Sequence, residues 1–429
     1  MTLLRQDDIA KLEAKVLEAL QRGSEDEGAR WWERILAGAP DHPKALLALS
    51  QRAFRGGDLA RARTLLERLV QVDGSDAQQW INLAVVCQGL RDDGGEERAI
   101  RGALTVDPSD LLGLLLRAAL LERQGKVHAA ASAYGAAAKV APPLAQLNPS
   151  LRPAVQRALA FRARYEHRLG THLDQFLEPY LKDAGGEQVG RFRDSVDIML
   201  GRKHRYDSQS ALYHYPGLAP ISFFERADFP WLDPIEAATG AIREEFMGAL
   251  EADGGRTPYL NYAADLPHHQ FAELNNSARW SAIHLYQDGL PVARNASRCP
   301  LTMELLAGAP LPEQAGRTPS AMFSLLKPQT RIPPHTGVSN ARLVTHLPLI
   351  VPERCGFRVG NETREWISGR AWVFDDTIEH EAWNLSEQLR VVLIFDIWHP
   401  NLSLAERALI SAMTLGINAF AASSGGFDL

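Results

Sequence analysis

The sequence predicts an α+β multidomain protein in which an all-α helical-repeat solenoid precedes an antiparallel β-domain. Two observations support this prediction. The first 145 residues are rich in Ala, Leu, Arg and Glu and carry apolar residues at helical spacing. From about residue 274 onward, short runs that are predicted as strands, among them REWISG at residues 364–369, alternate with turns of Gly, Pro, Asn and Asp. Many short strands with regular turn signals are typical of a sandwich or barrel, and a jelly roll is one member of that set.

The amino-terminal region repeats with a period of 34 residues, because Val72, Val106 and Val140 end similar units at that interval. This period is typical of tetratricopeptide-type helical hairpins. Three units are clear, and residues 29–40 are interpreted as the second helix of a degenerate first unit. One hairpin cannot bury its own apolar face, so the units are expected to stack. Residues 1–145 are therefore predicted to form tetratricopeptide-like repeats.

Three further segments are predicted after the repeats. Residues 146–203 keep a helical pattern and are interpreted as a helical linker region. Residues 204–273 form a Pro- and aromatic-rich arm with one helix from about 233 to 250, and we expect this arm to wrap the next domain. Residues 274–429 are predicted to form the jelly-roll domain and a docked C-terminal helix. The apolar run in that helix, residues 408–420, is shorter than the ~20 residues that span a bilayer.

Composition and charge argue against several classes of partner. The chain has 46 basic and 52 acidic residues, a net charge of -6, and no Lys/Arg run that would bind nucleic acid. The amino terminus lacks the apolar segment of a signal peptide, so a cytoplasmic protein without a membrane partner is expected. Cys87, Cys299 and Cys355 are widely separated, which favours neither a disulfide framework nor a thiolate zinc site.

Three histidines are candidate metal ligands: His335, His346 and His380. The first two lie in the stretch RIPPHTGVSNARLVTH, which is interpreted as a proline-bounded turn that leads into an apolar strand. A mononuclear non-haem iron site usually combines two histidines with a carboxylate. Gly337 stands two residues after His335, where that carboxylate would be expected. Spacing alone therefore leaves metal binding, hydrogen bonding and a core position open for each histidine.

Four motifs follow one another between Trp280 and Pro400: PHTGVSNARLVTHLPLIVP, NETREW, FDDTIEHEAWN and RVVLIFDIWHP. Together they resemble the catalytic domain of the aspartyl/asparaginyl β-hydroxylases. The resemblance implies a double-stranded β-helix that uses Fe(II), 2-oxoglutarate and O2. It implies hydroxylation of the β-carbon of an Asp or Asn residue in a peptide or protein, with release of succinate and CO2. The helical repeats could then offer a docking surface for that substrate.

The resemblance also assigns a role to individual residues. His335 and His380 match the two iron ligands, and the family holds iron without a carboxylate, so Gly337 becomes an expected feature. Asp376 lies four residues before His380. It is interpreted either as an acceptor that orients an iron-bound water or a histidine N–H, or as a turn-capping residue.

The 2-oxoglutarate site is predicted from the same match. Its distal carboxylate needs a planar bidentate donor, and Arg390 matches the family's arginine at this position. Ser324 matches the serine that binds the same carboxylate. His346 matches the histidine near the carboxylate beside the metal, and Trp280 matches a tryptophan that lines the pocket.

One departure from the family pattern concerns the four residues before His346. Family members often read R-L-R-x-H, whereas this chain has Val344 in place of the second arginine. Either Arg342 is expected to replace the missing arginine in binding the co-substrate, or this chain binds its co-substrate or substrate differently from those family members. Two alternatives stay open: a related hydroxylase that acts on a lipid acyl chain or a small amino-acid-derived molecule, and a repeat scaffold whose jelly roll is inactive.

Overall fold

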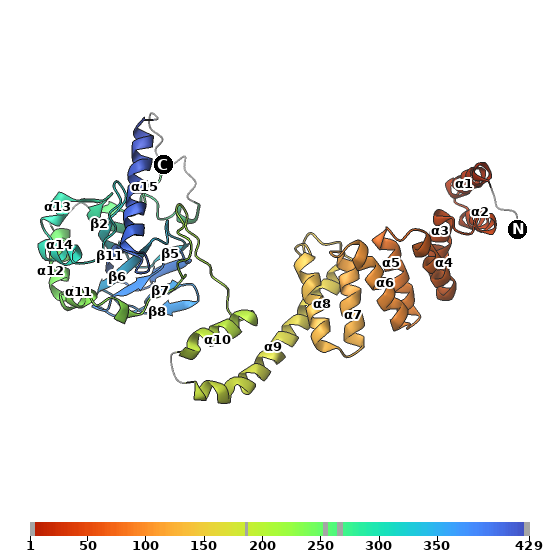
Figure 1. The fold of residues 1–429 in the computed structure, drawn as a ribbon, viewed down its shortest axis with the longest axis horizontal. Helices are drawn as coiled ribbons and strands as arrows, with labels where there is room; N and C mark the ends of the chain where they lie inside the picture. The colour runs from red at the N-terminus through yellow and green to blue at the C-terminus, as the bar shows by residue number, and fades with distance from the viewer. Residues whose placement is uncertain (1–4, 185–187, 252–255, 264–268, 424–429) are drawn as a thin grey trace. The chain divides into compact units, whose positions relative to one another are not determined.

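The computed structural model describes residues 5–184, 188–251, 256–263 and 269–423. Contacts divide the chain into two compact units, Met1–Gly201 and Arg202–Leu429 (Figure 1). The first unit is helical and the second contains antiparallel sheets, so the predicted α+β fold class is confirmed. The finer division into four segments, with a boundary at residue 203, stays a prediction.

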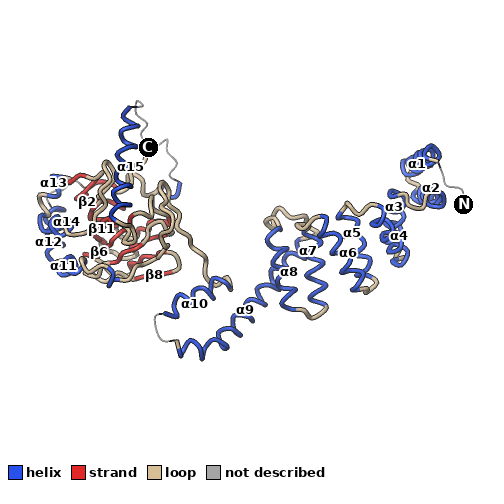
Figure 2. The backbone as a smooth tube through the Cα atoms, in the orientation of Figure 1, coloured by secondary structure: helices blue, strands red, loops and turns tan. Residues whose placement is uncertain are grey.

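The first unit consists of helical hairpins followed by two further helices (Figure 2). Its elements are α1 (Gln6–Gln21), α2 (Glu25–Gly38), α3 (Pro43–Arg55), α4 (Leu59–Val72), α5 (Ala77–Gly89), α6 (Asp93–Val106), α7 (Leu111–Arg123), α8 (Val127–Val140), α9 (Arg152–Asp183) and α10 (Gln188–Met199). The side chains of Asp58, Asp76, Asp92 and Asp110 cap the starts of α4 to α7 by accepting backbone N–H groups. The first hairpin, α1 with α2, has both of its helices, so the unit interpreted as degenerate is complete.

The second unit is a double-stranded β-helix made of two antiparallel sheets. Its strands are β1 (Thr257–Pro258), β2 (Trp280–Gln287), β3 (Leu290–Pro291), β4 (Ala321–Leu326), β5 (Thr330–His335), β6 (Arg342–Ile350), β7 (Cys355–Val359), β8 (Glu362–Arg364), β9 (Trp372–Phe374), β10 (His380–Asn384) and β11 (Arg390–Trp398). The larger sheet has the order β1-β2-β4-β11-β6-β9, with β3 on β2, and the smaller sheet has the order β5-β10-β7-β8. A cluster containing Val344, Val392 and Phe357 packs between the two sheets.

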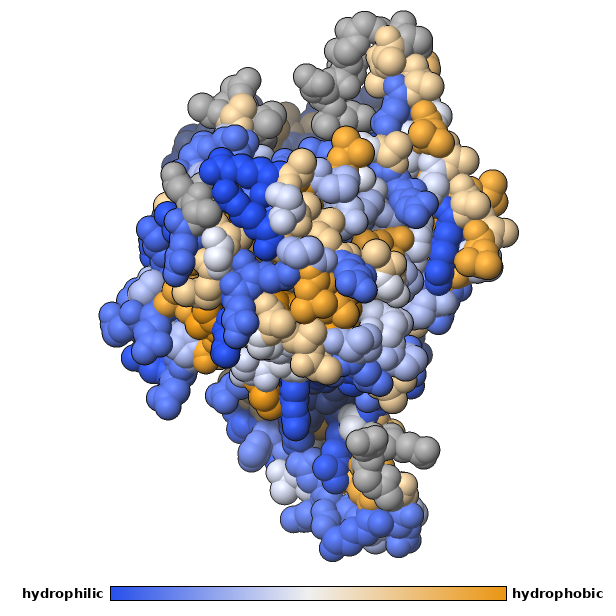
Figure 3. Space-filling view, turned by 90° about the vertical axis from the view of Figure 1, so that its left-hand side faces the viewer, coloured by the Kyte–Doolittle hydropathy of each residue, from blue (hydrophilic) through white to orange (hydrophobic). Residues whose placement is uncertain are grey.

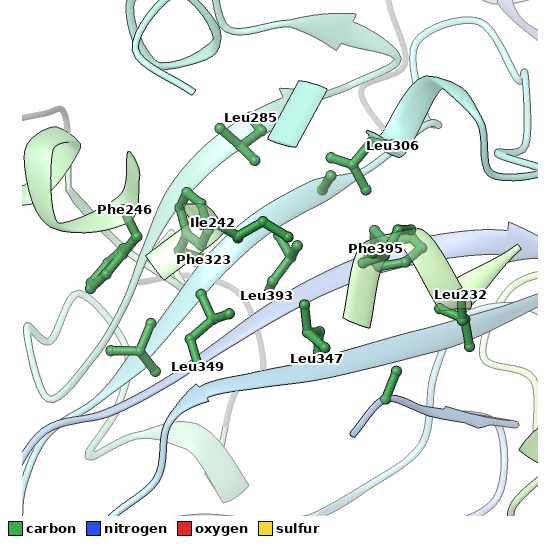
Figure 4. Packing of buried hydrophobic residues seen from close by; sticks show 14 of the residues in the cluster. Leu232, Ile242, Phe246, Leu285, Leu306, Phe323, Leu347, Leu349, Leu393 and Phe395 are labelled. Carbon is green, nitrogen blue, oxygen red and sulfur yellow. The ribbon is translucent and has the colours of Figure 1, made fainter. Parts of the chain in front are cut away.

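Helices cover the outer face of the larger sheet: α11 (Leu232–Ala237), α12 (Thr239–Glu251) and α14 (Pro300–Ala307). Figure 4 shows their apolar side chains against strand residues such as Phe323 and Leu393. The prediction of one helix from 233 to 250 is wrong, because the chain bends at Ala238. The Ala238 N–H closes α11 on Pro234, and the Thr239 hydroxyl donates to the Glu236 carbonyl.

The interpretation of the Pro-containing stretch before His335 as a turn is also wrong, since Thr330–His335 is strand β5. This strand lies at the edge of the smaller sheet, where Pro333 and Pro334 need no N–H to donate into a ladder. A second difference concerns the run Arg364–Gly369, predicted as a strand. The strand ends at Arg364, and Trp366 follows outside it.

The arm that begins the second unit runs along the β-domain. Gln209 donates a backbone N–H to Thr377, and Phe224 donates one to Val373. The C-terminal helix α15 (Leu404–Ser423) buries Ile410, but other apolar side chains stay exposed, among them Leu404 at 81% and Phe420 at 73%. Figure 3 shows such hydrophobic side chains along the helix at the top of the view. Within the described ranges, no helix is long and apolar enough to cross a membrane.

Candidate metal and co-substrate site

His335 and His380 lie side by side on neighbouring strands of the smaller sheet. They are direct partners in the register of β5 and β10, and the centroids of their rings are 4.1 Å apart. Phe271 packs edge-on against His335, and Phe374 packs edge-on against His380. The structure therefore brings together the two residues that the sequence proposed as ligands.

Backbone carbonyls fix the tautomer of both imidazoles. The Nδ1 atom of His335 lies 2.8 Å from the Pro333 oxygen, and the Nδ1 atom of His380 lies 3.0 Å from the Ile378 oxygen. A carbonyl oxygen can only accept, so each Nδ1 carries the hydrogen and each Nε2 keeps its lone pair. Burial lowers the pKa of His335 and holds the pKa of His380 well below its usual range. Two neutral imidazoles with available Nε2 atoms are a donor set that suits Fe(II).

Asp376 occupies the space that a side chain at residue 337 would need. A Cβ atom on Gly337 would overlap the Asp376 carboxylate, and the Gly337 N–H donates to the Asp376 backbone oxygen at 2.6 Å. The turn itself is capped by Asp375, whose carboxylate accepts from the Thr377 N–H and hydroxyl. Asp376 is 6% exposed, and its Oδ1 atom has no hydrogen-bond partner among the described residues.

Arg342 connects Asp376 to a second buried carboxylate. Its guanidinium donates to Asp376 at 3.1 Å and to Asp396 at 2.8 Å. Burial raises the pKa of Asp396 to about 6, and it also raises the pKa of Asp376, although Arg342 opposes both shifts. We call this cluster the Arg342 triad. Sequence reasoning missed Asp396, although its even spacing from Arg390 along one strand was a usable signal.

Arg390 lies in a separate group of buried polar side chains. It is 2% exposed, and its Nη1 atom donates to the Ser324 hydroxyl at 3.3 Å. The Trp280 indole donates to the same hydroxyl at 3.2 Å, and the Trp366 ring lies 4.9 Å from the Arg390 Cζ atom. Burial lowers the pKa of Arg390 to about 10. No carboxylate within the described ranges forms a salt bridge with this guanidinium.

Buried polar atoms around Arg390 lack partners in the part of the chain that the structure describes: Arg390 Nε, His346 Nδ1 and Trp366 Nε1. Buried donors without acceptors are costly, so this group is arranged for an anion that brings several oxygens. A dicarboxylate such as 2-oxoglutarate fits that requirement. Trp366 was missed because it was assigned to a strand, and its loop position carries no periodic signal.

Arg342 lies away from this group, contrary to the expectation that it would join in binding the co-substrate. In the pairing of β6 with β11, Arg342 is opposite Trp398, whereas Arg390 begins β11. Among the described residues, no group of three His, Cys, Asp or Glu side chains is arranged for a metal ion. The site is therefore a two-histidine pair between a cationic end and the Arg342 triad.

Comparison with known proteins identifies the class of this β-domain. The sequence model of the aspartyl/asparaginyl β-hydroxylase family matches residues 236–400. An ornithine lipid ester-linked acyl 2-hydroxylase from Rhizobium tropici is 32% identical over 213 residues, which cover 49% of this chain and 72% of that protein. The mouse aspartate β-hydroxylase domain-containing protein 2 is 36% identical over 256 residues, 57% of this chain and 71% of the relative.

The chain belongs to the aspartyl/asparaginyl β-hydroxylase family. The human aspartyl/asparaginyl β-hydroxylase is 28% identical over 394 residues, which cover 88% of this chain and 46% of the human protein. The chain thus spans about half the length of that relative, and the same is true of its mouse counterpart. Among solved structures, a crystal structure of MamA matches 46% of this chain and 96% of its own, with 15% identity and a TM-score of 0.32.

Proposed function

We propose that the protein is an Fe(II)- and 2-oxoglutarate-dependent dioxygenase that hydroxylates the β-carbon of an Asp or Asn residue in a peptide or protein. The observation that carries this proposal is the pair of neutral, tautomer-fixed imidazoles of His335 and His380. Bound Fe(II), 2-oxoglutarate and O2 would supply the oxidising chemistry, with one oxygen atom of O2 passing to the substrate and the other to succinate as CO2 is released. The chain's own residues would bind and orient these groups and the substrate, and they would exclude water from the site.

Arg390 would pair with the distal carboxylate of 2-oxoglutarate, and Ser324 would bind the same group. Both are nearly inaccessible to water, so their hydrogen bonds to an anion would be strong. His346 and Trp366 supply further buried donors on the same side. An inactive scaffold would have no use for a buried cation and a histidine pair together, which argues against that alternative.

The repeats are proposed to dock the substrate. A cavity of about 330 Å³ lies along α3 and α5, and it is lined by Phe54, Val85, Gln51, Gln78 and Asn82 among others. Apolar side chains beside neutral amides suit an extended peptide, because amides can bond a peptide backbone while the apolar side chains pack. This groove supports a peptide or protein substrate.

A second candidate function is hydroxylation of a lipid acyl chain. It is favoured by the relative named as an ornithine lipid ester-linked acyl 2-hydroxylase, 72% of which this chain covers. That match covers 49% of this chain. The cavity along α3 and α5 favours the peptide candidate, because its neutral amides and apolar side chains suit an extended peptide.

The test is aerobic incubation of the Fe(II)-loaded protein with 2-oxoglutarate and either a peptide pool or phospholipid vesicles that contain ornithine lipid. Succinate formation and products heavier by one oxygen are measured by mass spectrometry. Peptide products would support the first candidate, and lipid products the second. No succinate in either incubation would contradict both.

The separate role of the repeats is tested with the second unit alone, residues 202–429. It should bind metal and form succinate slowly without substrate, because those steps use residues of the β-domain. Turnover of a protein substrate should fall, since docking is lost. Equal turnover with and without the repeats would contradict the docking role.

A further inference from the structure

We propose that the residue hydroxylated by this site is Asn, which is recognised through its uncharged side-chain amide, and that the carboxylate side chain of Asp is rejected. This inference rests on the proposed function and names its substrate class. The residues that carry it are Arg342, Asp376, Asp396 and Val344, which no assignment above places in contact with the substrate.

The inner faces of β6 and β11 differ in charge from one end to the other. Alternate residues of a strand share a face, so Arg390 and Asp396 lie on the same side of β11, toward the smaller sheet. Arg342, Val344 and His346 share the matching face of β6. Arg390 and His346 form the end assigned to 2-oxoglutarate, and the other end is left for the substrate.

The arginine at the substrate end is already neutralised. Arg342 is bound by two carboxylates, at 3.1 Å and 2.8 Å, so the Arg342 triad has a formal charge of -1. Its carboxylates have more oxygen acceptors than Arg342 satisfies, and Asp376 Oδ1 lacks a partner within the described ranges. This end of the site therefore favours a group that donates N–H bonds and repels a group that only accepts.

The surroundings strengthen the same preference. The charged side chains close enough to influence the pKa of His335 are Asp376 and Glu379, and both are acidic. Val344, 7% exposed, is opposite Asp396 in the sheet and offers no charge to an incoming anion. The segments of the second unit that the structure does not describe contain no Lys or Arg in their sequences.

An amide and a carboxylate of the same shape should therefore bind very differently. The amide can donate to Asp376 and needs no counter-ion, whereas the carboxylate would face the net negative charge of the Arg342 triad at low dielectric. The amide should bind at least tenfold more tightly than the carboxylate. An acyl chain would avoid the repulsion but would leave the acceptor of Asp376 without a donor.

The experiment uses the full chain loaded with Mn(II) and saturated with 2-oxoglutarate, without oxygen. The probes are N-acetyl-asparagine amide, N-acetyl-aspartate amide and N-acetyl-leucine amide. Their binding is read from the change in the Mn(II) electron paramagnetic resonance spectrum. The expected order is asparagine first, with the aspartate probe at least tenfold weaker and the leucine probe weaker than asparagine.

Two variants test the cause. Asp396→Asn removes one negative charge and keeps an oxygen for Arg342, so it should tighten the aspartate probe about tenfold relative to asparagine. Val344→Lys adds a cation at the same end of the site and should also tighten binding of the aspartate probe relative to the asparagine probe. It takes the place of Asp396→Asn if that variant fails to fold. Asp233→Asn is the matched control, because that side chain is 75% exposed on another element, and it should change neither affinity.

The outcomes distinguish a failure of the proposed function from a failure of the preference for an amide. Failure of the protein to bind Mn(II) or 2-oxoglutarate contradicts the proposed function before any probe is added. With both bound, equal or tighter binding of the aspartate probe overturns the inference, and so does a leucine probe that binds as well as asparagine. Binding of none of the probes also overturns it, because the target group would then lie elsewhere.

Discussion

Replacing Arg390 with Met should have opposite effects on the free and the co-substrate-bound protein. The guanidinium is 2% exposed and forms no salt bridge with a carboxylate of the described residues. The variant Arg390→Met keeps much of the volume and removes the charge. We expect the protein without 2-oxoglutarate to become more stable and its response to 2-oxoglutarate to shrink.

The size of the first effect follows from the pKa of Arg390. Burial lowers it from 12.5 to about 10, and this difference corresponds to about 3 kcal/mol. Because the folded-state pKa lies below the unfolded value, the penalty is fully present at pH 7 and is relieved only as the pH rises through 10. The bonds to Ser324 and the contact with the Trp366 ring offset about 1–2 kcal/mol of it. The net gain on substitution is therefore about 1–2 kcal/mol, or roughly 2–8 °C in Tm.

The size of the second effect follows from the lost ion pair. A charge-assisted pair contributes about 1.5–3 kcal/mol, so the variant should bind 2-oxoglutarate about ten- to a hundred-fold more weakly. At a concentration that is 100 times the wild-type Kd, the co-substrate stabilises the wild type by about 2.7 kcal/mol. The same concentration should stabilise the variant by less than about 1.5 kcal/mol.

The assay is thermal unfolding of the Mn(II)-loaded protein with and without 2-oxoglutarate, followed by tryptophan fluorescence. Six of the nine tryptophans lie in the second unit, so this signal reports mainly on the β-domain. Arg331→Met is the control, because that side chain is 64% exposed. A variant that is less stable without 2-oxoglutarate, or one with an unchanged response to it, would refute the reasoning.

Three further predictions concern the metal pair and a buried histidine. His335→Ala and His380→Ala should each weaken Mn(II) binding at least a hundredfold in calorimetric titrations while the circular dichroism spectrum is kept; full metal retention would remove that residue from the ligand set. Gly337→Ala should displace the Asp376 carboxylate and weaken Mn(II) binding about tenfold, and unchanged affinity would show that the carboxylate moves freely. Burial lowers the pKa of His399 to about 4, so stability should fall as the pH drops below the ordinary value of 6.5, by about 2 kcal/mol at pH 5. His399→Gln should remove that part of the acid sensitivity in urea unfolding, and an identical pH profile would contradict it.

Strands with a continuous apolar or alternating pattern were predictable from the sequence. The runs that became β6 and β11 were recognisable because each is long and buried on both faces. Strand β5 was not recognisable, because Pro333 and Pro334 are turn residues by local preference and only the edge position makes them acceptable. The bend at Ala238 was also not predicted, because the hydrogen bond from the Thr239 hydroxyl to the Glu236 carbonyl leaves no mark in the apolar periodicity.

The site was predictable where motif and resemblance agreed and not where contacts between distant strands decide. His335 and His380 were proposed together, and the register of their strands places them side by side. The triad role of Arg342 was not foreseen, since it depends on two carboxylates from other elements. Trp366 was missed because nothing in a loop sequence shows which side chain turns inward.

The edge strand that obscured the prediction also explains how the metal pair is positioned. The Pro333 carbonyl orients His335, and the Ile378 carbonyl orients His380 through the same spacing of two residues. Proline fixes the backbone dihedral φ, so the carbonyl that orients His335 belongs to a stiff segment. Both imidazoles receive their orienting hydrogen bonds from backbone carbonyls two residues earlier in the chain, which leaves the side chains of Asp376 and Arg342 available for their contact with each other. The hydrogen bonds that orient the two imidazoles thus do not involve the side chains of the Arg342 triad, and substitutions in this triad should change selectivity without removing the two ligands.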